Sequence, residues 1–72
     1  MPLSMISQGE VCEVIRIASG EEVRKHLLNL GIVPGAKLKL ISGTGSNVIL
    51  QILSARVAIN ADTASRIMVR II

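Results

Sequence analysis

Six glycines divide this chain of 72 residues into short apolar segments. They stand at positions 9, 20, 31, 35, 43 and 45, between the segments rather than inside them. Because glycine weakens the interior of a helix or a strand, this placement marks the places where the elements end. We therefore expect several short elements around one small core, in a single domain that spans residues 1–72.

Apolar residues with a period close to two predict five short strands, at residues 11–17, 37–40, 48–53, 55–59 and 66–71. In the first strand Val14 and Ile15 stand side by side, which breaks the alternation and predicts a β-bulge. In the last strand Ile67, Val69 and Ile71 are expected to point inward. Small polar residues and glycines at 43–47 have the composition of a hairpin loop.

A helix of about three turns is expected after the first strand. Ser19 and Glu22 have the spacing of a capping box, so the helix should begin beside them, at about residue 21. It can run only to about Leu30, because Gly31 suits the left-handed position that follows a helix. Pro34 and Gly35 then fit the central pair of a type II turn.

A second, single helical turn is expected at residues 60–64, where Asn60 and Asp62 are both candidate caps. Together these elements describe a mainly β protein: a small SH3-like barrel of about five strands. One helix is inserted after the first strand, and a short helical turn precedes the last strand.

Composition excludes several classes of function. The chain has no Phe, Tyr or Trp, so it lacks the rings on which binders of single-stranded nucleic acid stack bases. Its longest run of hydrophobic residues is three, far short of a membrane span, and no secretory signal is visible, which favours a soluble, cytoplasmic protein. The net charge is +3, with outward basic side chains expected at Lys37, Lys39, Arg56, Arg66 and Arg70. We expect these to form a solvated face rather than a nucleic-acid footprint.

The stretch from Arg24 to Gly35, Arg-Lys-His-Leu-Leu-Asn-Leu-Gly-Ile-Val-Pro-Gly, resembles the Arg-x-x-Leu-x-x-Leu-Gly-Ile/Leu-x-Pro-Gly segment of the FeoA family. Weaker similarity extends from Leu3 to the closing segment at residues 64–69. The resemblance implies an SH3-like barrel with a helix after the first strand. It also implies a small cytoplasmic protein of ferrous iron transport that acts beside FeoB, a membrane permease with a cytoplasmic G-protein domain.

Residues that could carry chemistry are few. Cys12 and His26 are the only cysteine and histidine, and two ligands are too few for a zinc site. His26 is also the only side chain suited to act as a base at neutral pH. A catalytic nucleophile needs such a base within hydrogen-bond reach and a third group that orients the base. We therefore predict no catalytic residue, no metal site and no cofactor, and hence that the chain is not an enzyme.

A docking surface is predicted from apolar residues outside the core pattern. On the helix, Val23, Leu27 and Leu30 share one stripe, whereas Leu28 lies well outside it, beside Arg24 and Lys25. Ile49 and Leu53 are expected on the strand face opposite the core-facing residues. Several exposed apolar residues on a small domain suggest docking or self-association. The predicted partner-docking residues are Arg24, Lys25, Leu28, Ile49 and Leu53.

The resulting hypothesis is a non-enzymatic accessory protein that docks on the cytoplasmic side of an FeoB-type transporter and modulates iron uptake. Self-association into a homo-oligomer is a second use of the same surface. The alternative is a regulatory module like the C-terminal domain of metal-dependent transcription repressors, which resembles this family in fold. Neither nucleic acid nor insertion into a membrane is expected.

Overall fold

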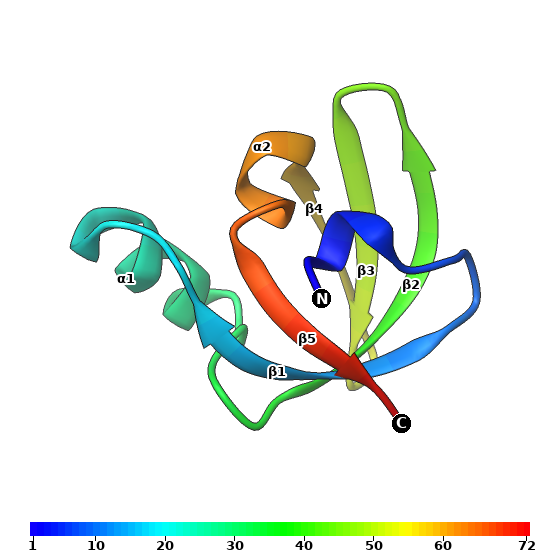
Figure 1. Ribbon diagram of the computed structural model, residues 1–72, viewed down its shortest axis with the longest axis horizontal. Helices are drawn as coiled ribbons and strands as arrows, with labels where there is room; N and C mark the ends of the chain where they lie inside the picture. Colours follow the sequence, from blue (N-terminus) through cyan, green and yellow to red (C-terminus); the bar gives the residue numbers. More distant parts are fainter.

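The computed structural model describes residues 1–72, except for the side chain of Thr44, and contains one five-stranded sheet in the order β4-β3-β2-β1-β5 (Figure 1). Every neighbouring pair is antiparallel. The strands are β1 (Val11–Ile17), β2 (Lys37–Thr44), β3 (Asn47–Ile52), β4 (Ala55–Asn60) and β5 (Ile67–Ile71). Two α-helices accompany them, α1 (Glu21–Asn29) and α2 (Ala61–Ala64), with a 3-10 turn at Leu3–Met5. The mainly β fold with one helix after the first strand and a short one before the last is confirmed.

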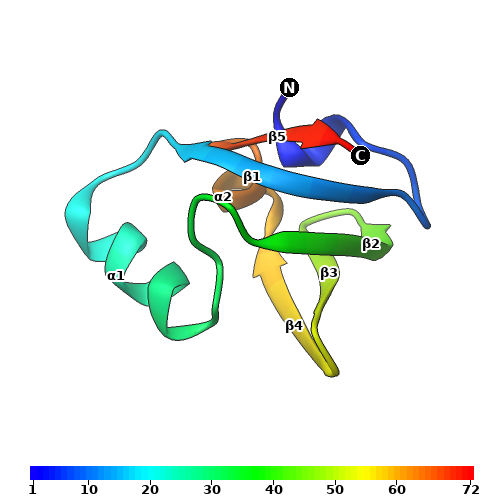
Figure 2. The ribbon, with the colours of Figure 1, turned by 90° about the horizontal axis from the view of Figure 1, so that it is seen from below.

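The sheet curls over on itself, so that β1 and β5 lie across the core from β3 and β4 (Figure 2). Fifteen apolar residues fill the space between them, and among the described side chains no polar one is buried. The fully buried residues of largest volume are Leu3, Leu27, Ile32, Leu38, Leu50 and Ile67. Strand alternation accounts for most of this core, and α1 contributes Leu27.

Helix α1 packs on the barrel through the predicted stripe. Leu27 is fully buried, and Val23 and Leu30 are partly buried against the core. The helix ends as expected: Gly31 has φ +88°, its N–H donates to the Leu28 carbonyl at 3.0 Å, and the N–H of Ile32 donates to the Leu27 carbonyl at 2.8 Å. This pair of bonds is a Schellman motif, which satisfies carbonyls that the helix end would leave free.

The predicted capping box is wrong. Gly20 is the N-cap of α1, and no side chain caps it. Because Ser19 lies one residue before the cap, its hydroxyl is out of register with the third N–H of the helix, which a capping box requires. The type II turn at Pro34 and Gly35 is confirmed, since Gly35 has φ +92° and the N–H of Ala36 donates to the Val33 carbonyl at 2.9 Å.

The hairpin of β2 and β3 is tighter than predicted. Both strands extend into the expected loop, and only residues 45 and 46 lie outside them, so Gly43 lies within β2. The predicted bulge in β1 is confirmed by a register shift between Val14 and Arg16. A second shift, between Leu40 and Ser42 in β2, was not predicted. Bulges bend and twist strands, which is what a small sheet needs in order to curl.

Three local predictions concern the last third of the chain. The cap of α2 is confirmed at Asn60, whose Oδ1 accepts from the N–H of Thr63 at 2.7 Å. The predicted strand at 48–53 is one residue too long, because Leu53 leaves β3 and lies in the β3–β4 turn with φ +56°. Ile71 was expected to point inward, but it is 44% exposed, because β5 runs past the edge of the core at its end.

Candidate partner-docking site

The outer face of α1 carries the exposed leucine that the helical period predicted. Leu28 is 59% exposed, and Arg24 and Lys25 beside it are also exposed. With Glu21 and Val33 these residues line an open groove of about 450 Å³. Full burial of an exposed leucine contributes about 1.5–3 kcal/mol, so a partner that buries the exposed part of Leu28 gains roughly half of that.

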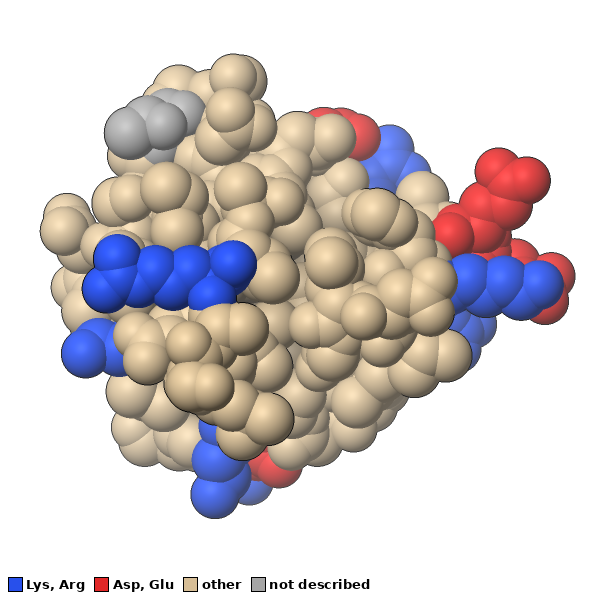
Figure 3. Space-filling model, turned by 180° about the vertical axis from the view of Figure 1, so that it is seen from behind, with Lys and Arg blue, Asp and Glu red and all other residues tan. Residues whose placement is uncertain are grey.

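The charges of this face are available to a partner. The ion pairs among the described side chains join Arg66 to Asp62 at 3.6 Å and Arg70 to Glu13 at 2.7 Å. Arg24 and Lys25 therefore take part in neither. Figure 3 shows charged side chains of both signs gathered at the end of the molecule that α1 forms, whereas the middle of this view carries mostly uncharged side chains. Charges around an apolar anchor orient a partner and speed its association.

The predicted docking residues do not lie together. Ile49 is half-buried on β3, opposite Ala58, and Leu53 is 93% exposed at the β3–β4 turn. Figures 1 and 2 both place this turn away from α1. The structure thus joins Arg24, Lys25 and Leu28 in one groove and leaves Ile49 and Leu53 elsewhere. The reason is connectivity: a strand period assigns a residue to a face but does not say which other element faces the same direction.

The predicted outward basic residues are all exposed: Lys37, Lys39, Arg56, Arg66 and Arg70. Two of them form the ion pairs given above. In the view of Figure 3 the blue side chains stand in separate places. Basic side chains that stand apart in this way give a solvated surface rather than one concentrated positive patch.

Cys12 and His26 lie in different surroundings. Cys12 is fully buried in the core, where burial, with a smaller contribution from Glu10, raises the pKa of its thiol above the ordinary value. His26 is exposed on α1. Among the described residues no three of the types His, Cys, Asp and Glu gather in a way that could hold a metal ion.

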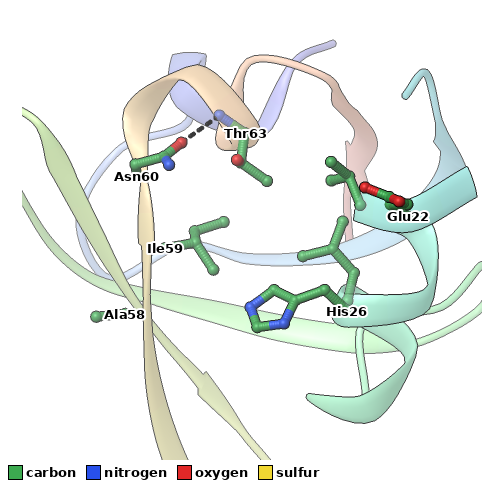
Figure 4. A pocket seen from close by; sticks show the side chains of 8 residues that line it. Glu22, His26, Ala58, Ile59, Asn60 and Thr63 are labelled. Carbon is green, nitrogen blue, oxygen red and sulfur yellow. Dashed lines mark hydrogen bonds between the residues drawn. The ribbon is translucent and has the colours of Figure 1, made fainter. Parts of the chain in front are cut away.

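Sequence patterns missed a second groove, on another side of α1. It has a volume of about 330 Å³ and is lined by Glu22, Val23, His26 and Leu27 of α1, Ala58, Ile59 and Asn60 of β4, and Thr63 of α2. Figure 4 shows the His26 side chain extending from α1 toward β4, below Ile59. The helical spacing of Glu22 and His26 was readable, but nothing in the sequence pairs residues 22–27 with residues 58–63.

The architecture defines the class: a small SH3-like domain with a helix inserted after the first strand. A family model described as the FeoA domain matches residues 1–71, and the chain therefore belongs to the FeoA family. A protein of Methanocaldococcus jannaschii, provisionally named Fe(2+) transport protein A, is 34% identical over 68 residues, which are 94% of this chain and 83% of the relative.

Solved structures agree with this membership. A crystal structure titled iron uptake regulatory protein (FeoA) has a TM-score of 0.90 at 32% identity, covering 99% of this chain and 95% of that one. The solution structure of the FeoA protein from Chlorobium tepidum has a TM-score of 0.92 at 32% identity, covering 99% and 70%. A manganese-dependent transcriptional repressor matches with a TM-score of 0.92 at 20% identity, over all of this chain and 36% of that one, and so shares the fold.

No helix in the part of the chain that the structure describes is long and apolar enough to cross a membrane.

Proposed function

We propose that this chain is a cytoplasmic accessory protein of ferrous iron transport that docks on the cytoplasmic side of an FeoB-type transporter and modulates uptake. It does so by binding, with no catalysis of its own. Membership of the FeoA family and the name of the archaeal relative support the assignment to iron transport. The observation that carries the docking proposal is Leu28, exposed by 59% and flanked by Arg24 and Lys25.

The chemistry of the α1 groove indicates what the transporter should offer. An apolar side chain would enter the groove against Leu28 and Val33. Acidic residues around it would meet Arg24 and Lys25, which lie outside the two ion pairs found among the described side chains. Interfaces of this kind bury a central apolar anchor inside a polar rim, and most of the binding energy comes from the anchor.

The proposal is tested by co-purification from membranes. Affinity-tagged chain should capture the FeoB-type transporter, and Leu28→Glu should abolish the capture, because it places a charge at the apolar anchor. Leu53→Glu is the matched control: it alters another exposed leucine, at the β3–β4 turn, and should leave capture intact. Capture that survives Leu28→Glu and fails with Leu53→Glu would move the docking surface to the turn.

A second measurement separates docking from its consequence. In cells that take up radioactive ferrous iron through the transporter, Leu28→Glu should change the uptake rate toward that of cells lacking this chain. Uptake that responds to the chain but not to Leu28→Glu would show that the outer face of α1 is not the contact.

The alternative, a regulatory module of the metal-dependent repressor type, is supported by likeness of fold alone. The repressor that matches is 20% identical, and this chain corresponds to 36% of its length. Capture of a DNA-binding protein in place of the transporter, in the same experiment, would favour this alternative.

A further inference from the structure

Strand β4 has one edge that no other strand covers. It pairs with β3 and stands at the end of the sheet order. The opposite end of the sheet is protected, because Pro2 bridges Met68 and the N–H of Val69 donates to the Met1 carbonyl at 2.7 Å. Among the described residues, no backbone hydrogen bond outside the β3–β4 pairing involves residues 55–59. Open strand edges of this kind are templates for an added strand.

The register identifies which backbone groups are free. Ile52 and Ala55 pair on either side of the two-residue turn, so they form the hydrogen-bonded pair that closes the hairpin. In an antiparallel ladder, hydrogen-bonded and non-hydrogen-bonded pairs alternate. Arg56 and Ala58 therefore direct their N–H and C=O groups away from β3, toward the open edge.

The second groove lies beside this edge. Its apolar floor is formed by Val23 and Leu27 of α1 and by Ile59 of β4, with Glu22, His26, Asn60 and Thr63 as polar surroundings. Figure 4 shows α1 and β4 as two opposing walls, with the side chains of His26 and Ile59 between them. At about 330 Å³, the groove has room for a few side chains, near the lower limit for ligand pockets.

We propose that this groove binds an extended peptide segment of a partner protein, which adds to β4 as a sixth strand. The backbone of the segment would bond to Arg56 and Ala58, and every second side chain would be apolar and enter the groove between α1 and β4. A Lys or Arg of the segment would lie beside Glu22, the acidic residue of the groove. This is recognition by strand addition, in which main-chain bonds give affinity and side-chain pockets give specificity.

Two features favour an extended peptide over a second copy of the domain or a small molecule in this groove. The groove is lined by both α1 and β4 and has a volume of only about 330 Å³, which suits a few side chains of one extended segment rather than the much larger edge of a second barrel. A compact small molecule could fill the apolar floor, but it would not satisfy the backbone groups along β4. The inference is independent of the docking proposed above, because Leu28 lies on a different side of α1.

The test selects peptides from a random library displayed on phage, with the intact chain as target, and then uses the synthetic peptides. The selected sequences should alternate apolar and polar residues and carry Lys or Arg at one end. When the amides of the chain are followed by NMR, the largest changes should appear at Ala58, Arg56 and His26. Exchange of the Arg56 and Ala58 amide hydrogens with solvent should slow on binding.

Two variants distinguish strand addition from simple filling of the groove. Ala58→Pro removes an outward N–H, and proline is tolerated at such an edge position because it breaks no bond to β3. Binding should weaken about tenfold or more, since one peptide carbonyl loses its donor. Ala58→Val, the matched control, also changes the side chain in the groove wall but keeps the N–H, so it should lose much less binding than Ala58→Pro. Equal losses in the two variants would contradict a backbone bond at Ala58.

A third comparison leaves the protein unchanged and so cannot be confused with unfolding. Methylating the peptide backbone nitrogens that face β4 should abolish binding, while methylating the alternate nitrogens should not. The proposal is wrong if no peptide is selected, if the selected peptides perturb residues away from β4 and α1, or if both methylation patterns have the same effect.

Discussion

The inner and outer faces of α1 differ in how far folding buries their apolar side chains. Leu27 and Leu28 are adjacent and chemically identical, yet Leu27 is fully buried and Leu28 is 59% exposed. A rotation of about 100° per residue separates them, which carries one into the core and leaves the other in solvent. The inner face therefore holds the helix on the barrel, and the outer face is free to take up another task.

This difference matters because α1 has little stability of its own. It has nine residues and no side-chain cap at its N-terminus, whereas isolated helices shorter than about 12–15 residues are marginal in water. Packing through Leu27, Val23 and Leu30 must therefore supply most of what keeps it folded. Both grooves depend on that packing, since each is lined by residues of α1.

The difference between the two faces of α1 predicts that the largest loss of stability follows from a change at Leu27. Leu27→Ala should lower the free energy of unfolding by about 2–5 kcal/mol, because it leaves a cavity in the core. Chemical denaturation measures this, with Leu28→Ala as the matched control, for which we expect little change. Equal losses in the two variants would mean that the assignment of inner and outer faces is wrong.

The stability of the folded core should also fall at alkaline pH, because the thiol of Cys12 is buried there. Burial raises the pKa of this thiol in the folded chain. Above about pH 8.5 the unfolded chain loses the proton while the folded chain keeps it, so stability falls as pH rises. The slope is at most about 1.4 kcal/mol for each pH unit, because one proton is involved.

Melting temperatures measured between pH 7 and 10 test this expectation about Cys12. Cys12→Ala removes the thiol and should flatten the part of the decline that begins near pH 8.5. A decline of the same size in the variant would show that other groups cause it.

Leu53 extends the comparison to a second exposed leucine. Unlike Leu28, it lowers the stability of the folded domain through its backbone conformation. It is 93% exposed, and its φ of +56° lies in the left-handed region, which costs residues other than glycine roughly 1–2 kcal/mol. Asparagine tolerates this region better, so Leu53→Asn should stabilise the domain by about 1 kcal/mol. Leu53→Ala keeps the strain and should change the melting temperature little. A fall in stability with Leu53→Asn would contradict the assignment of strain.

The smallest effect on stability is expected at the outer face itself. Leu28→Glu should change the free energy of unfolding by no more than about 0.5 kcal/mol, as is usual for exposed positions. Circular dichroism during thermal unfolding measures it. If the variant unfolds, Leu28 belongs to the core, and the loss of transporter capture would then have a structural cause.

Much of the architecture was predictable because its causes are local. Alternation gave the strands, Gly31 and the Pro34–Gly35 turn marked the end of α1, and Asn60 capped α2 as expected. The phase of the helix placed Leu27 inside and Leu28 outside. The failures at Ser19 and Leu53 lie at element ends, where a shift of one residue decides which group is the cap or the turn.

The sequence by itself determined the order of the strands and α-helices, the core face of most of them, and the position of Arg24, Lys25 and Leu28 together on the outer face of α1. Only the tertiary structure decided that Ile49 and Leu53 lie apart from these three residues, that β4 keeps an open edge, and that this edge and α1 line one groove. The physical reason is the separation along the chain of the residues that interact. Periodicity, caps and turns act over a few neighbouring residues, whereas the order of strands in a curled sheet arises from pairings between segments far apart in the chain.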